Sequence, residues 1–143
     1  MIKIIQAKTR IELIQVRNIR IKIFVIEQQI PWRWEFDIHD KNAVHLIVVN
    51  SKEIIGTGRF YRDKYSGDYK LGRMAVVETY RNQGIGSKML IKIEEIGRNK
   101  KVPKIILEAQ SDKLHFYVNH GYKIEGDKYL MDGIYHTKMF KEF

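Results

Sequence analysis

The chain has 143 residues, a length at which single domains are commonest, and 44% of them are hydrophobic, enough for one buried core. It has no cysteine, so disulfides, thiolate metal sites and a cysteine nucleophile are excluded. The net charge of +9 favours acidic partners such as nucleic acid, anionic lipid or a phosphorylated cofactor, but the basic residues are scattered from Lys3 to Lys141, as on a solvated surface.

The first elements are expected to be a strand and a helix. Ile2–Ala7 reads as a short strand, and Thr9 is placed to cap a helix that begins near Arg10. Between Ile11 and Val25 the apolar residues fit both helical and strand spacing. Nearly twenty residues without a turn signal favour the helix.

A loop and three strands are expected next. The segment 28–40 has no clean period and holds Pro31 among aromatic, acidic and imidazole side chains, so it is interpreted as a loop. Strand patterns at 43–49 and 54–61 predict a hairpin, and a further strand at 69–77 follows a turn.

The second half of the chain carries a helical pattern followed by strands. From Ile85 the apolar residues recur at helical spacing, and Gly97 lies near the expected end. Asp112 is placed to cap a short helix that ends before Gly121. The expected strands are 104–109, 122–125 and 135–140. With no linker, repeat or low-complexity tract, the pattern indicates one mixed α/β domain over residues 1–143.

The turn Arg81–Gly86 joins the apolar stretch Leu71–Val77 to the helix that begins at Ile85. Glycines let the backbone turn tightly and approach a ligand closely, and the first amides of a helix have no carbonyl partners. These properties suit a phosphate group. An isolated glycine pair of this kind is as often a tight turn and nothing more.

Three features stand in a fixed order: this turn, a strand that ends in Glu108–Gln110, and the aromatic segment Phe116–Tyr122. Together they resemble the GNAT superfamily of N-acetyltransferases. The family signature of Arg or Gln, two variable residues, Gly, one variable residue, then Gly or Ala is matched by Arg81, Gly84 and Gly86. Its aromatic pair and later Gly-aromatic pair are matched by Phe116, Tyr117, Gly121 and Tyr122.

A small bacterial branch of this superfamily, often labelled ElaA-like, is similar at further positions. They are Glu27, Gln28, Pro31, Glu35, Asp37, Asp40, Ala43, His45, Gly58, Arg59, Gly72 to Val76, Asp132, Gly133, Ile134, His136 and Met139. The resemblance spans essentially the whole chain. It implies a single-domain fold with a mixed, mostly antiparallel central sheet flanked by helices.

The resemblance also implies acetyl-CoA as the cosubstrate. Its pyrophosphate would lie on the amides of Gln83–Ser87, with Arg81 adding positive charge, and its pantetheine arm would run beside the backbone of Met74–Val76. The expected cofactor-binding residues are Met74, Ala75, Val76, Arg81, Asn82, Gln83, Gly84, Ile85, Gly86, Ser87, Gln110 and Phe116. Gln110 and Lys113 stand where many members have Asn and Ala, and Lys113 leaves the local detail open.

The catalytic residue that the resemblance implies is Tyr117, at the position where many members carry a tyrosine that protonates the departing CoA thiolate. A phenol is neutral at pH 7 and can donate a hydrogen bond, which suits a general acid. Outside this motif, simple packing would be the commoner role of such a tyrosine.

The acceptor side offers several candidates and no clear choice. Carboxylates and imidazoles can take a proton from the incoming amine, and arginines can hold a phosphate or carboxylate of the acceptor. The substrate candidates are Glu27, Glu35, Asp37, His45 and His136 for the proton, Arg59 and Arg73 for an anion, and Trp32, which with Trp34 fits a pocket wall or a homodimer contact. The spacing of His115 and His120 does not align them on one helical face, so no metal site is expected.

The sequence therefore predicts an acetyl-CoA-dependent N-acetyltransferase whose small-molecule or peptide primary amine attacks the thioester directly in a ternary complex. A non-catalytic acyl-CoA-binding regulatory protein is the alternative, and a basic nucleic-acid-binding domain is a weaker one. No secretory signal pattern and no membrane-spanning run is visible, so we expect a cytoplasmic protein that binds neither membrane nor nucleic acid.

Overall fold

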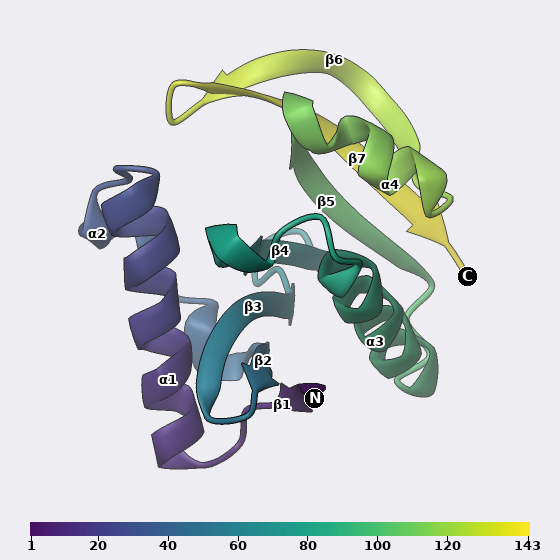
Figure 1. The fold of residues 1–143 in the computed structure, drawn as a ribbon. Helices are drawn as coiled ribbons and strands as arrows, with labels where there is room; N and C mark the ends of the chain where they lie inside the picture. Colours follow the sequence, from purple (N-terminus) through teal and green to yellow (C-terminus); the bar gives the residue numbers. More distant parts are fainter.

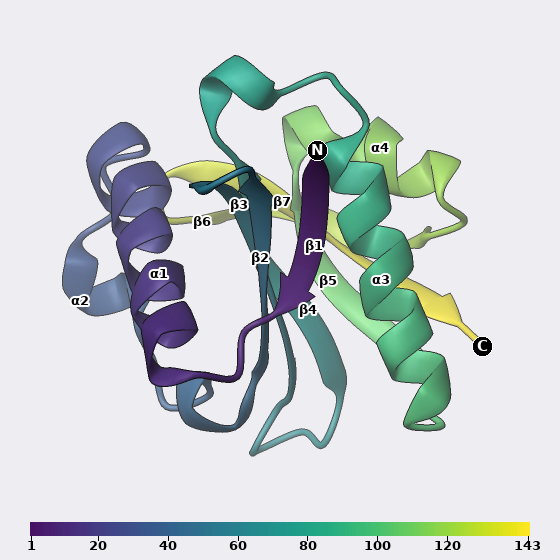
Figure 2. The same ribbon diagram turned by 60° about the horizontal axis from the view of Figure 1, so that its bottom comes forward.

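Seven strands form one sheet in the order β1-β2-β3-β4-β5-β7-β6 in a computed structural model that describes residues 1–143 (Figure 1). All neighbouring strands are antiparallel except β4 and β5. Helices cover both faces, with α1 and α2 on one side and α3 and α4 on the other (Figure 2). The predicted mixed, mostly antiparallel α/β fold is confirmed.

The N-terminal strand and helix begin as the sequence predicts. β1 is Ile2–Gln6, and α1 is Arg10–Arg20. A capping box starts α1: Thr9 Oγ1 accepts from the Glu12 amide, and Glu12 accepts from the Thr9 amide. The chain then continues as a π-helix, η1, over Ile21–Glu27. The helical interpretation of this segment is confirmed, whereas its π-helical end has no sequence signal.

The segment after η1 is more ordered than the loop that the sequence predicts. Pro31 precedes a short helix, α2, at Trp32–Glu35, and a 3-10 turn, η2, follows at Asp40–Asn42. Proline favours such a position because its missing N–H is not needed at a helix start. The prediction of a loop throughout 28–40 is therefore wrong at α2.

The central strands agree with the predicted hairpin. β2 is Val44–Asn50, β3 is Glu53–Arg62 and β4 is Tyr69–Val76. The β2–β3 turn holds Ser51 with a positive φ of 58°. Each boundary lies within two residues of the prediction.

β4 contains a bulge and then separates from its neighbour. Arg73 has a φ of 51°, and the pairing register with β3 shifts around Gly58. β5 is Lys104–Gln110, and it pairs with β4 only along Tyr69–Leu71. Beyond Leu71 the β5-facing edge of β4 has no strand partner, so the sheet opens there.

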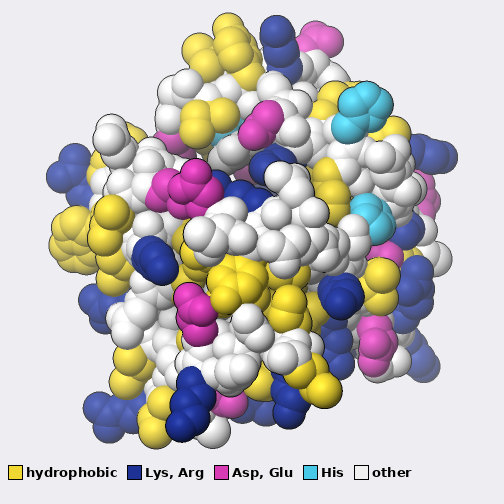
Figure 3. All heavy atoms as spheres, in the orientation of Figure 1, with side chains coloured by type: hydrophobic (Ala, Val, Ile, Leu, Met, Phe, Trp, Pro, Cys, Tyr) yellow, Lys and Arg dark blue, Asp and Glu magenta, His cyan; other side chains and the backbone are white.

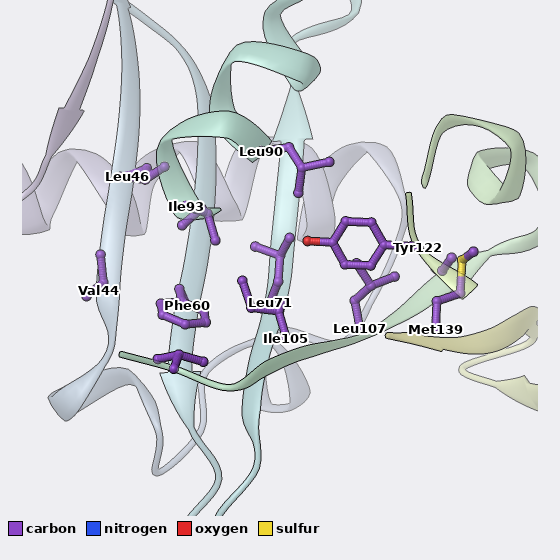
Figure 4. Packing of buried hydrophobic residues seen from close by; sticks show 12 residues of the cluster. Val44, Leu46, Phe60, Leu71, Leu90, Ile93, Ile105, Leu107, Tyr122 and Met139 are labelled. Atoms are coloured by element: carbon purple, nitrogen blue, oxygen red, sulfur yellow. The ribbon is translucent and has the colours of Figure 1, made fainter. Parts of the chain in front are cut away.

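The longest helix, α3 at Ile85–Asn99, follows the 3-10 turn η3 at Glu78–Tyr80. Its apolar face packs on the sheet, where Leu90 and Ile93 are fully buried (Figure 4). Burial of apolar side chains of this kind is the main stabilising contribution to the fold, and it fixes where α3 begins relative to β4.

The C-terminal elements are longer than predicted. After η4 at Ser111–Lys113 come α4 at Leu114–Asn119, β6 at Lys123–Met131 and β7 at Ile134–Glu142. No side chain caps α4, so the prediction that Asp112 caps it is wrong. β6 continues past its predicted end at Glu125 through an irregularity that includes Gly126, at a φ of 80°. No helix is both long and apolar enough to cross a membrane.

Candidate active site

An open cleft of about 1090 Å³ lies where β4 and β5 separate. Its walls come from the end of η1, the start of α3, α4 and the turn between β6 and β7. In Figure 3 basic side chains lie deep in a hollow near the middle of this face, with acidic side chains at its rim. Residues from six separate parts of the chain therefore meet in one cavity.

The start of α3 contributes a row of free backbone amides to this cleft. Asn82 and Gly84 have positive φ angles of 63° and 78°. None of the backbone amides from Asn82 to Ser87 has a hydrogen-bond acceptor within the protein. Successive free amides at the positive end of a helix dipole are the donors that a phosphate needs. Gly86 also lets the helix approach Phe116, since a Cβ there would lie 3.3 Å from the ring.

The Arg81 side chain links this turn to two other parts of the chain. Its Nε donates to the Val76 carbonyl at 2.8 Å, and its Nη2 lies 2.7 Å from Glu27 Oε2. The guanidinium thus ties the end of β4 to the end of η1, and part of its charge is already neutralised by Glu27. A direct contact between Arg81 and a phosphate stays a prediction.

Tyr117 lies in the same cleft, on α4. Its ring packs edge-on against Phe116 and Tyr122, with centroids 5.0 and 5.8 Å away. Burial raises the pKa of Tyr117 to about 12, so the phenol stays protonated at neutral pH. Its hydroxyl makes no hydrogen bond within the protein, so that proton is free for a ligand.

Three arginines and three carboxylates form a network at the other end of the cleft. Arg20 Nε donates to Glu35 Oε2 at 2.8 Å, and Arg73 Nε donates to the same oxygen at 3.0 Å. Arg20 also binds Asp40. Arg59 Nη1 reaches Asp37 at 2.7 Å and Asp40 at 3.0 Å. The formal charges of the three arginines and three carboxylates cancel. The contacts of Arg59 and Arg73 hold the segment around α2 against β3 and β4.

The network shifts the pKa values of its carboxyl groups in opposite directions. Burial raises the pKa of Glu35 despite the nearby Arg73 and Arg20. Burial alone would also raise the pKa of Asp40. Hydrogen bonds from Arg20 and from the Asp37 amide outweigh this effect and lower that pKa to about 2. At pH 7 Asp40 is therefore ionised and engaged by arginine.

His136 has a fixed tautomer in its neutral form. Its Nδ1 donates to the Ile134 carbonyl at 2.8 Å, which leaves Nε2 as the ring's proton acceptor. The side chain lines the cleft and stacks on Tyr129. His45, in contrast, is buried outside the cleft with Nε2 2.8 Å from the Asp40 carbonyl oxygen.

The cleft brings together most of the predicted site residues. Those that line it are Glu27, Glu35, Arg59, Arg73, Met74, Ala75, Val76, Arg81, Asn82, Gly84, Ile85, Gly86, Ser87, Gln110, Phe116, Tyr117 and His136. Gln83, Trp32, Asp37 and His45 do not line it, although the free amide of Gln83 belongs to the α3 turn. Trp32 is 65% exposed. The absence of a metal stays a prediction.

The cleft also holds polar residues outside the predicted site set, among them Gln28 and Glu108. Glu108 lies on β5 between the buried residues Leu107 and Ala109, so it points to the opposite face of the sheet. It has no ion-pair partner. The alternation along β5 was a signal that could have placed it. Gln28 offered no such signal, because it follows the π-helix.

The fold is a single α/β unit with one large cleft where its sheet opens, and known proteins share it. Residues 12–143 match the profile of the acetyltransferase (GNAT) domain. The N-acetyltransferase YjcF of Bacillus subtilis (strain 168), itself uncharacterized, is 30% identical over 142 residues, covering 98% of this chain and 99% of YjcF.

Two crystal structures have the same fold. Escherichia coli ElaA has a TM-score of 0.85 at 22% identity, with 99% of both chains covered. An acyl-CoA N-acyltransferase from Pseudomonas aeruginosa also has a TM-score of 0.85 at 22% identity, covering 99% of this chain and 98% of that one. The chain belongs to the GNAT acetyltransferase family, and its activity class is that of an acyl-CoA-dependent N-acetyltransferase.

Proposed function

We propose that the protein transfers an acetyl group from acetyl-CoA to a primary amine by direct attack in a ternary complex. The observation that carries this proposal is the row of free amides from Asn82 to Ser87, which opens into the same cleft as Tyr117. The amides would bind the pyrophosphate, and the phenol would lie at the thioester end.

The unpaired edge of β4 supports the placement of the pantetheine arm between these two points. Beyond Leu71 the backbone edge toward β5 is open, and Met74–Val76 line the cleft there. A free strand edge offers donors and acceptors to an extended ligand, as it would to another strand. The bulge at Arg73 turns the backbone just before Met74, so that an amide in this stretch can polarise the thioester carbonyl.

The chemistry needs one proton removed and one supplied. The neutral amine nitrogen bonds to the carbonyl carbon, the C–S bond breaks, and the sulfur leaves as a thiolate. Tyr117 donates its proton to that sulfur. His136 takes the surplus proton from the amine nitrogen through its free Nε2, directly or through water.

His136 is favoured over the other proton acceptors that the sequence predicts, because those are engaged elsewhere or lie outside the cleft. Glu27 pairs with Arg81, and Glu35 is only 1% exposed between Arg20 and Arg73. Asp37 and His45 lie outside the cleft. A cytoplasmic location fits a cosubstrate of this kind and is part of the proposal.

Tyr117→Phe tests the proposal. The variant should bind CoA with unchanged affinity by calorimetry and lose about 10²–10⁴-fold in turnover, the usual contribution of a general acid. Turnover is measured as thiol release from acetyl-CoA with a panel of amines. Tyr135→Phe, an exposed tyrosine outside the cleft, is the control and should leave both values unchanged.

Two results would contradict the proposal in different ways. CoA binding without thiol release for any amine would favour the non-catalytic acyl-CoA-binding alternative. Full turnover by Tyr117→Phe would remove the acid role from this tyrosine while leaving the transfer reaction in place.

A further inference from the structure

Arg59 carries an unused hydrogen-bonding edge in the wall of the cleft. Its side chain is only 3% exposed and comes from β3. Nη1 is bound by Asp37 and Asp40, whereas Nε is buried without any partner. Nη2 makes no hydrogen bond either. The Nε/Nη2 side of the guanidinium is therefore free as a pair of parallel donors.

The neighbouring arginines show that this free edge is particular to Arg59. Arg20 uses all three of its nitrogens on Glu35 and Asp40. Arg73 uses its own Nε/Nη2 edge on Glu35 and the Trp34 carbonyl. Among the three arginines of the network, the Nε of Arg59 is the only buried nitrogen without a partner, and an orphaned buried N–H indicates a missing one.

The free edge is held ready for a ligand. The guanidinium lies over the ring of Tyr61, 4.4 Å from its centroid, and two carboxylates fix Nη1. Parallel N–H groups of a fixed guanidinium match the two oxygens of a carboxylate or phosphate. An orientation fixed in advance also lowers the entropy lost on binding.

We propose that the Nε/Nη2 edge of Arg59 binds an anionic oxygen group, a carboxylate or a phosphate, carried by the amine acceptor. This inference rests on the proposed function, because the acceptor must share the cleft with the thioester. Gln28 Oε1 is a second buried atom in the cleft wall that has no hydrogen-bond partner within the protein.

The charges of the network argue against the opposite class, a cation held by the acidic residues. Glu35, Asp37 and Asp40 are each bound by at least one arginine, so none is free to hold an ammonium group. Within this network the carboxylates are thus already neutralised, and the group that stays open is a donor, the Nε/Nη2 edge of Arg59.

Matched amines test this inference through acceptor selectivity. β-Alanine and 3-aminopropyl phosphate carry the anion, whereas propylamine and β-alaninamide carry none. We expect kcat/KM for at least one anionic amine to exceed both neutral ones by tenfold or more. Arg59→Lys should bring the ratio close to one, because an ammonium group cannot offer two parallel donors.

Arg20→Lys is the matched control, since Arg20 belongs to the same network but does not line the cleft. It should lower activity on all amines alike and keep the selectivity. Values of kcat/KM for both anionic amines that do not exceed those for the neutral amines in the native protein, or selectivity that survives in Arg59→Lys, would overturn the inference.

A binding measurement separates this inference from the proposed reaction. The ¹⁵N–¹H signal of Arg59 Nε, assigned by its loss in Arg59→Lys, is followed in the CoA-loaded native protein. Propionate or propyl phosphate should shift it saturably, and propionamide should not; the anion that does so identifies the group. If neither anion moves the signal, the inference fails even where amines are acetylated. If one does and no amine reacts, only the proposed reaction fails.

Discussion

Some side chains around the cleft have hydrogen-bonding groups that are free for a ligand, whereas others are paired with one another. Arg20 and Glu35 are each only 1% exposed, and such a pair is tolerable only because its polar atoms are satisfied. These partners lie 15 to 38 residues apart in the chain, so no local pattern predicts them. Sequence reasoning could name Glu35, Arg59 and Arg73, but not that they neutralise one another.

Asp40 provides a prediction about pH at this scale. Its pKa falls from 3.8 to about 2 in the folded protein. One pKa unit corresponds to about 1.4 kcal/mol, so the ionised carboxylate stabilises the fold by about 2 kcal/mol at pH 7. Because the folded pKa is depressed, this contribution is present above pH 4 and is lost as the pH falls toward 2.

Asp40→Asn should therefore reduce the free energy of unfolding by about 2 kcal/mol at pH 7, and the gap to the native protein should close between pH 4 and 2. Urea unfolding at several pH values measures this. The raised pKa of Glu35 has the opposite effect on how stability depends on pH. Glu35 is present in both proteins, so its contribution largely cancels in the difference between their free energies of unfolding. A gap that stays constant down to pH 2 would show that Asp40 acts through packing and not through its charge.

At the level of elements, local sequence signals predict where helices and turns begin better than they predict side-chain contacts. The capping box at Thr9 and the turn at Ser51 each depend on a few adjacent residues, and both elements lie where the sequence indicates. The π-helix after Arg20 and the continuation of β6 past Glu125 depend on tertiary packing and strand pairing, so propensity alone misses them.

Gly84→Ala tests the α3 turn as an element. At a φ of 78° any side chain is strained although no atom lies within 4 Å, so the variant should be destabilised by about 1 kcal/mol. Relief of that strain would rotate the free amides, and CoA affinity should fall about tenfold by calorimetry. Gly133→Ala, equally strained at a φ of 76° but in the β6–β7 turn, should lose similar stability and keep its affinity for CoA. An equal loss of affinity in both variants would contradict this role of the turn.

For the whole molecule, the position of the cleft follows from strand order. Only the parallel β4–β5 pair leaves the sheet open, and it opens because these strands pair over so short a stretch. A single sequence gives the strands but not their order. The element pattern predicted one mixed α/β domain, and the mostly antiparallel sheet was implied by the resemblance carried by the Arg81–Gly86 turn and the Phe116–Tyr122 segment. The separation of β4 and β5 then explains why residues from both ends of the chain share one site.

The overall charge gives the last prediction. A charge of +9 that is spread over the surface should bind nucleic acid only weakly, and an interaction of this kind weakens steeply with salt. A fluorescent DNA 20-mer followed by anisotropy should lose most of its binding between 50 and 200 mM salt, while CoA affinity measured by calorimetry changes less, because directional amide donors contribute to it. Saturating CoA should not displace the DNA, since the two use different surfaces. Stoichiometric displacement of the DNA by CoA would mean that the cleft itself binds the nucleic-acid backbone. That result would support the alternative of a basic nucleic-acid-binding domain.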